Sequence, residues 1–327
     1  MAGHHAPLLF VYMKLLVYLQ DTFEMPDVDF VISTVDRPLS LSLPPSSTDH
    51  PVMRFCKTDS NADVLIPITH FHSKGYDRLL DLTPALEKTY PWPNRTNRVF
   101  GRFSPYTRHA NPLDPSSPAR LGASGVDICA RLSSRVTRVC DVRTHFSEWC
   151  QRPEQRADFD VRIDGFVTME HHASFKYLVH LDGQGLSSRL DQLLPLKAMV
   201  MKEESGYRAF YHHLLKPHVH YVPFWKERPD DALQVLAWAR SNDAKARTIG
   251  EAGQALALKY LNARARACYW YHLLLEYSKL HTYTPGRGAG LALLRGGPLV
   301  RVSEYLATTA EAYEGGKHIE MLRKWAP

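Results

Sequence analysis

The chain has 327 residues, of which 44% are hydrophobic and 23% charged, the proportions of a globular protein. This length suits two α/β lobes better than a single core. The formal net charge of +6 favours an anionic partner, yet the chain contains no run of five Lys or Arg residues and no basic stretch interleaved with aromatic residues. We therefore expect no nucleic-acid partner, and a mildly basic surface without any anionic partner is the plainer interpretation of the charge.

The first predicted element is a helix at the N-terminus. Residues 8–19 are apolar with helical spacing after Pro7, and Lys14 interrupts the run. The run is far shorter than a membrane span and lacks a small-residue cleavage site. We expect an amphipathic helix, no transmembrane segment in this chain and no visible signal peptide, so any secretory signal would lie outside it.

Short apolar runs then predict the buried strands of parallel sheets. Helices are predicted between and after them, with Asp230 or Asp231 as an N-cap. The alternation on both sides of residue 95 predicts two doubly wound lobes, residues 1–95 and 96–269, followed by C-terminal helices in 270–327 that pack back on the first lobe. The predicted strands cover 30–32, 64–68, 99–100, 177–179, 198–201 and 220–223, and the predicted helices cover 187–194, 244–262 and 270–277.

The five cysteines include no C-x-x-C pair, which argues against a zinc ribbon or a thioredoxin-like site. Cys129, Cys140 and Cys150 are close enough in sequence for one local disulfide if the compartment is oxidising.

Polar residues follow the predicted strands, where ligands of doubly wound sheets bind. Gly183-x-Gly185 before Ser187-Ser188-Arg189 combines backbone N–H groups, hydroxyls and a cation, a pattern that fits either a phosphate site or a turn that caps a helix. Asp36 follows the 30–32 strand and is either a general base or the residue that closes a turn. The glycine-rich 286–290 follows a helix and is expected to be a flexible connection.

Nothing in the sequence has the spacing of a metal site. The histidine pairs, such as His70 and His72, lack the i, i+4 spacing of H-E-x-x-H. We find no D-x-D flanked by apolar strand residues that would hold a divalent ion, and Asp27-Val28-Asp29, which has the D-x-D form, precedes its strand, where a ligand is not expected. We predict that no metal is bound.

Several segments resemble glycosyltransferase family 90, the family of the Rumi-type protein O-glucosyltransferases and the fungal capsule-associated xylosyltransferases. Residues 26–38 are similar to the family pattern P-D-x-x-x-V-I-N-T-R-D-x-P, and 215–223 to L-K-P-x-x-H-Y-I-P. Further likenesses, to F-x-K-T…D-I-x-x-P and K-Y-L…G…S-x-R, lie in 55–67 and 176–189, and 270–279 is also similar. Each likeness is modest, but all follow the order of the family.

The resemblance implies a GT-B-like α/β fold with two Rossmann-like lobes and an active site in the cleft between them. It further implies an inverting mechanism, a UDP-sugar donor and no cofactor. Residues 1–95 would form the acceptor side and 96–269 the UDP-sugar-binding lobe. The family's catalytic aspartate falls on Asp36, and its pyrophosphate-binding arginine on Arg189, beside Ser188 and Gly183.

The family's second phosphate region, F-R-G-S followed by an arginine, falls on residues 100–108. Here it reads Phe-Gly-Arg-Phe-Ser, with the glycine and arginine transposed. The donor contacts implied in this region are Arg102, Ser104 and Arg108. Residues 33–35 read Ser-Thr-Val in place of Asn-Thr-Arg, so contacts to the acceptor are expected to differ.

The resemblance thus implies transfer of glucose or xylose from a UDP-sugar to a hydroxyl of a protein serine or a glycan, in the lumen of the endoplasmic reticulum or Golgi. The sequence does not choose between the two sugars. The altered 100–104 stretch supports an alternative, a catalytically inactive relative that binds sugar or protein.

Overall fold

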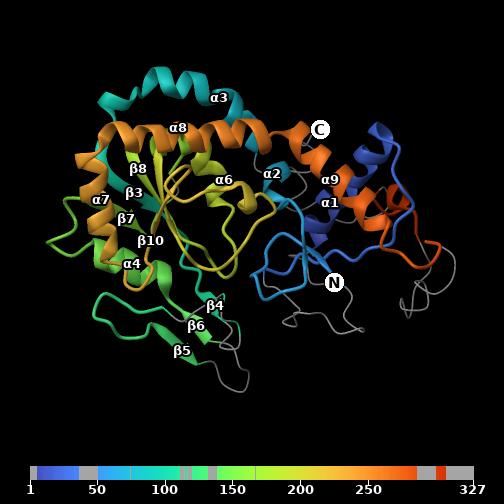
Figure 1. Cartoon of the computed structure of the whole chain (residues 1–327), viewed down its shortest axis with the longest axis horizontal. Helices are drawn as coiled ribbons and strands as arrows, with labels where there is room; N and C mark the ends of the chain where they lie inside the picture. Colours follow the sequence, from blue (N-terminus) through green and yellow to red (C-terminus); the bar gives the residue numbers. More distant parts are fainter. Residues whose placement is uncertain are drawn as a thin grey trace.

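The structure is a computed structural model that describes residues 6–36, 51–73, 75–110, 114, 116, 120–131, 138–165, 167–285 and 300–306. Its centre is a five-stranded sheet in the order β10–β9–β8–β3–β7, with every neighbouring pair parallel (Figure 1). The predicted α/β class is confirmed. These strands are β3 (Thr96–Arg102), β7 (Phe159–Arg162), β8 (Phe175–His180), β9 (Met199–Glu203) and β10 (Val222–Phe224).

Helices cover both faces of this sheet, which explains why its inner strands read as continuous apolar runs. All six residues of β8 are buried. Phe100 and Leu178 pack on one face with α3 (Tyr76–Thr89), α6 (Arg189–Leu193) and the end of α8 (Asp243–Tyr260). Val99 and Val179 point to the opposite face, toward α4 (Val142–Cys150) and α7 (Asp231–Ser241). The strand predicted at 220–223 is observed at 222–224, as β10.

The predicted helices form close to the expected places, but the expected cap at α7 works differently. Asp230 is the N-cap residue and makes no side-chain capping bond. Instead the Asp231 carboxylate accepts from the backbone N–H groups of Trp225 at 2.8 Å and Lys226 at 3.0 Å. That carboxylate therefore fixes the turn between β10 and α7.

The N-terminal part is less regular. It contains α1 (Ala6–Thr22), the parallel pair β1 (Met53–Arg54) and β2 (Val64–Leu65), and a single bridge from Ile32 to Met53 in place of the predicted strand at 30–32. α9 (Ala263–Ser278) returns to pack on α1, with the Tyr12 and Trp270 rings 6.0 Å apart (Figure 1). Among the described residues, no helix is long and apolar enough to cross a membrane.

Residues 76–89, placed by the sequence in the first lobe, pack as α3 against the large sheet. Leu79, Leu80 and Leu86 of this helix share one core with Phe100 and with Phe71 of the N-terminal part. Within the described residues the N-terminal part and the large-sheet part therefore share one hydrophobic core.

A small antiparallel sheet that the sequence did not reveal lies beside the large one. Its order is β4 (Arg108–Ala110), β6 (Arg138–Cys140) and β5 (Cys129–Arg131). Cys129 and Cys140 are directly opposite in register and form a disulfide, whereas Cys150 is a free, buried thiol.

The remaining elements are short, and they are α2 (His70–Ser73), α5 (Met169–His172), η1 (Trp92–Asn94), η2 (Leu194–Leu196) and η3 (His212–Leu214). The glycine-rich stretch 286–290 and most of the predicted C-terminal helices beyond α9 lie outside the described residues.

Candidate active site

The order in which strands are added to the large sheet reverses between β3 and β8. The next strand in the sequence, β7, lies on one side of β3, and β8, β9 and β10 then follow on the other side. The loops that leave the carboxyl ends of β3 and β8 therefore diverge, and such a switch point is where open α/β sheets bind ligands.

A cavity of about 550 Å³ lies at this position, a volume within the usual range for small-molecule sites. One wall is formed by the loops after β3 and β8. The opposite wall comes from the N-terminal part, with Thr34, Val35, Asp36, Phe55, Ile68, Thr69 and His70. Three arginines and one carboxylate line the cavity: Arg102, Arg143, Arg189 and Asp36. This balance of charge suits an anionic ligand.

Six of the seven residues predicted for the site line this cavity, and the seventh does not. The six are Asp36, Arg102, Ser104, Gly183, Ser188 and Arg189. Arg108 is instead buried in β4, where its Nη2 donates to Glu203 Oε2 at 2.6 Å. Arg108 aligned with a phosphate-binding arginine of the family, but its charge is engaged inside the protein.

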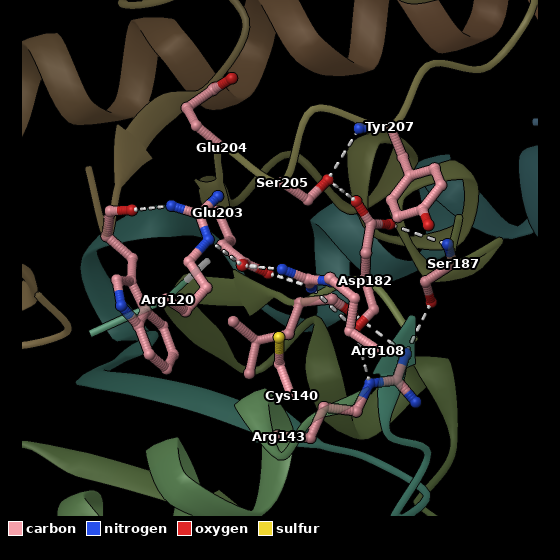
Figure 2. A network of polar contacts seen from close by, with 12 residues as sticks. Arg108, Arg120, Cys140, Arg143, Asp182, Ser187, Glu203, Glu204, Ser205 and Tyr207 are labelled. Carbon is pink, nitrogen blue, oxygen red and sulfur yellow. Dashed lines mark hydrogen bonds and ion pairs between the residues drawn. The ribbon is translucent and has the colours of Figure 1, made fainter. Parts of the chain in front are cut away.

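Arg108 and Arg120 pair with Glu203 at the end of β9 (Figure 2). Burial opposes ionisation of this carboxyl, but the two guanidinium groups outweigh burial and lower its pKa to about 2. Arg108 Nη2 also donates to the Asp182 carbonyl at 3.2 Å. The buried Arg108–Glu203 pair therefore supports the loop after β8 through the Asp182 carbonyl.

Arg143, the second residue of α4, is the cation that sequence reasoning missed. Its guanidinium donates to the Asp182 carbonyl at 3.2 Å and to Ser187 Oγ at 3.1 Å (Figure 2). It also donates to the carbonyls of Ser104 at 3.1 Å and Leu181 at 3.0 Å. One side chain thus ties the loop after β3 to the loop after β8. Burial lowers the pKa of Arg143 to about 10, so it stays charged at neutral pH.

No signal in the sequence pointed to Arg143, because it follows β6 of the small sheet and does not come from the end of a large-sheet strand.

Asp182 holds the loop after β8 from within. Its carboxylate accepts from the Ser187 backbone N–H at 2.8 Å and from the Ser205 hydroxyl (Figure 2). A carboxylate that accepts from a backbone N–H five residues later fixes a tight loop. The predicted Gly183–Arg189 loop is therefore held in place by buried side chains on both sides.

Arg189 begins α6 and lines the cavity. Burial lowers its pKa. In the described part of the chain its guanidinium forms no ion pair, unlike that of Arg102, which donates to Asp160 Oδ1 at 2.8 Å. A half-buried cation that has no counter-charge among the described residues is suited to an anionic ligand.

Asp36 reaches the same loop from the opposite wall. A Cβ built on Gly185 would lie 2.5 Å from the Asp36 carbonyl oxygen and 2.9 Å from Asp36 Oδ1. Only glycine allows this approach, because any side chain at residue 185 would push the Asp36 segment away. The cavity therefore brings a carboxylate and the cationic loop into contact.

Among the residues that the structure describes, no group of three or more His, Cys, Asp or Glu side chains is arranged to hold a metal ion. Metal independence stays a prediction.

The fold and the cavity together define an α/β protein with a cationic loop facing a carboxylate across a small-molecule site. Glycosyl transferase family 90 matches residues 132–307, more than half of the chain, and the chain belongs to this family.

Similar proteins include the O-glucosyltransferase rumi of Drosophila pseudoobscura pseudoobscura, 28% identical over 79% of this chain and 62% of the relative. The human protein O-glucosyltransferase 3 is 26% identical over 86% of this chain and 52% of the relative. The chain thus spans about half to three-fifths of the length of these relatives. A solved structure of Anabaena HepE with UDP and glucose has a TM-score of 0.39 and 13% identity, covering 69% of this chain and 63% of HepE.

Proposed function

We propose that this chain is a glycosyltransferase that moves glucose or xylose from a UDP-sugar to a hydroxyl of a protein or glycan acceptor, with inversion and without a metal ion. The observation that carries the proposal is the cavity itself. It places the Asp36 carboxylate against a loop that carries Arg189 and is tied down by Arg143.

In the proposed reaction the acceptor oxygen forms a bond to the anomeric carbon of the sugar while the bond from that carbon to the phosphate oxygen breaks. The acceptor proton passes to the Asp36 carboxylate, as in general base catalysis. UDP leaves with the bonding electron pair, and Arg189 and Arg143 stabilise its growing negative charge. Attack opposite the leaving group inverts the anomeric centre.

Glucose is the first donor sugar to test, because the curated relatives are named O-glucosyltransferases. The disulfide between Cys129 and Cys140 supports an oxidising compartment such as the lumen of the endoplasmic reticulum or Golgi.

The experiment has two parts. UDP affinity is measured by calorimetry, and UDP-glucose and UDP-xylose are then compared for turnover with candidate acceptors, with NMR of the product to read the anomeric configuration. UDP binding followed by transfer with inversion is the expected result. UDP binding without turnover of any sugar would instead favour the alternative, an inactive relative that binds sugar or protein.

A further inference from the structure

A hydrogen bond between His70 and Ser188 joins the two walls of the cavity. His70 Nδ1, on the N-terminal side, lies 2.7 Å from Ser188 Oγ in the loop after β8. Both residues line the cavity, and they are 118 positions apart in sequence. His70 begins the short helix α2, and Ser188 immediately precedes Arg189 at the start of α6.

The Ser188 hydroxyl is not used by its own helix. Ser188 is the N-cap residue of α6 but makes no side-chain capping bond. Within the described residues, the contact with His70 is the only hydrogen bond of this hydroxyl. A hydroxyl carries one hydrogen and two lone pairs. It can therefore accept from His70 and still donate to a ligand in the cavity.

From this arrangement we infer that His70 is a positioning residue of the donor site. His70 Nδ1–H donates to Ser188 Oγ, and the Ser188 hydroxyl then points its hydrogen at an oxygen of the bound sugar nucleotide, beside Arg189. The inference rests on the proposed function. It adds that binding of the donor depends on a residue of the acceptor-side wall, acting through Ser188.

The partner of Ser188 matters because a hydroxyl without a hydrogen-bond partner rotates freely. A hydroxyl that accepts a hydrogen bond from a fixed donor is pre-organised to donate to its ligand. The charged residues that line the cavity with Ser188 are Arg102, Arg143, Arg189 and Asp36. Within the described residues none of the three arginines donates to Ser188 Oγ, so His70 is the group that holds this hydroxyl, and a hydrogen bond from Ser188 to the Asp36 carboxylate would turn its hydrogen away from the nucleotide.

The test is a double-mutant cycle on UDP affinity, measured by calorimetry with the full chain. The variants are His70→Phe, Ser188→Ala and the double variant, and thermal unfolding checks that each is folded. Each single change should weaken UDP binding about tenfold. The double variant should bind no worse than Ser188→Ala, since His70 acts only through that hydroxyl.

A conservative variant separates this role from simple packing. The substitution His70→Asn places an amide nitrogen near the position of Nδ1 and should restore most of the affinity that His70→Phe loses. In steady-state kinetics His70→Phe should raise KM for the donor with little change in kcat. His213→Phe is the matched control, because His213 Nδ1 bonds to the nearby Phe210 carbonyl and His213 is not among the cavity-lining residues.

Three results would overturn the inference. His70→Phe with wild-type affinity would remove His70 from the site, and multiplying effects in the double variant would show that His70 acts independently of Ser188. Failure of His70→Asn to restore binding would reduce the role of His70 to packing. In each of these cases the wild-type protein still binds UDP. Absence of UDP binding by the wild type would instead overturn the proposed function, and this inference with it.

Discussion

The two walls of the cavity are built differently. The loops after β3 and β8 are held by the buried side chains of Arg143 and Asp182. Arg143 donates to the carbonyls of Ser104 and Leu181 and to Ser187 Oγ, and Asp182 accepts from the Ser187 backbone N–H. The facing segment that ends in Asp36 has no regular strand among the described residues; its described contacts include a bridge from Ile32 to Met53 and Arg54 Nη2, which donates to Ser33 Oγ at 2.7 Å. Pre-organisation is greatest where charge must be stabilised, and irregular backbone lies on the wall that would meet the acceptor.

The sharpest way to test this division is to remove the carboxylate from the irregular wall. Asp36→Asn keeps the shape but cannot accept a proton, so the transfer rate should fall about 10²–10⁴-fold. UDP affinity should be unchanged, because the predicted donor contacts lie on the other wall. Rate and affinity are measured on the same folded protein, with Asp27→Asn as control. Loss of UDP affinity in Asp36→Asn would break the comparison.

The free energy of unfolding should depend on pH through Asp191, which lies in α6 beside the donor-side wall. Burial raises the pKa of this carboxyl from 3.8 to about 7 in the folded protein. The folded state therefore binds the proton more tightly than the unfolded state, and stability is lost as the pH rises from about 4 to about 7. The loss attributable to this group is about 4 kcal/mol at most.

Asp191→Asn can still face the Tyr211 hydroxyl, which lies 2.6 Å from Asp191 Oδ1, but cannot ionise. Urea unfolding at pH 5 and pH 8 should show a smaller pH dependence for this variant than for the wild type. An equal pH dependence of stability in the variant and the wild type would mean that Asp191 is ionised in both the folded and the unfolded protein.

The Cys129–Cys140 disulfide precedes α4, whose Arg143 holds the donor-side wall. It should contribute about 3 kcal/mol to the free energy of unfolding, estimated from the loop that it closes. Cys129 and Cys140 are 11 residues apart, and α4 with Arg143 starts two residues after Cys140. The double change to serine should lower the free energy of unfolding by this amount and leave UDP affinity unchanged, because backbone carbonyls hold Arg143. Exposed Cys268→Ser is the control, and an equal loss there would contradict the assignment.

Arg189 tests the cationic side of the comparison directly. Arg189→Ala should weaken UDP binding about ten- to a hundredfold, which corresponds to roughly 1.5–3 kcal/mol for a charge-assisted contact. Arg156→Ala removes an exposed arginine outside this cavity and should have no effect. If the two variants bind UDP equally well, general positive charge explains the affinity and Arg189 has no specific role.

The smallest expected effect is that of metal removal. Arginines and backbone N–H groups can carry the leaving-group charge, so transfer should survive excess EDTA. Activity that disappears and returns with manganese would show that the donor-side wall is completed by a metal ion.

The parts of the fold with a local signature could be predicted from the sequence. β8 and β9 read as apolar runs because both faces of the sheet are covered, and α8 and α9 followed from composition and spacing. β7 was missed because its alternating exposure places Asp160 and Arg162 on an edge strand. The packing of α3 against the large sheet depends on tertiary contacts that leave no mark in its own pattern.

The candidate site was found where residues follow strands and missed where they do not. Gly183, Ser188 and Arg189 follow β8, so their place in the cavity could be expected. Arg108 also follows a strand, β3, but a partner nearly a hundred residues away, Glu203, draws its charge into the core. Arg143 and His70 reach the cavity from short helices, and only the assembled structure brings them there.

The state of the five cysteines has a practical consequence. Cys268 is exposed on α9, Cys56 and Cys150 are buried, and Cys129 and Cys140 are joined to each other. Burial also raises the pKa of the Cys56 and Cys150 thiols, which keeps them protonated and slow to react with maleimides. The unmodified protein can therefore take a fluorophore or a surface tether at one defined position, which would give a uniformly oriented population for single-molecule or immobilised work.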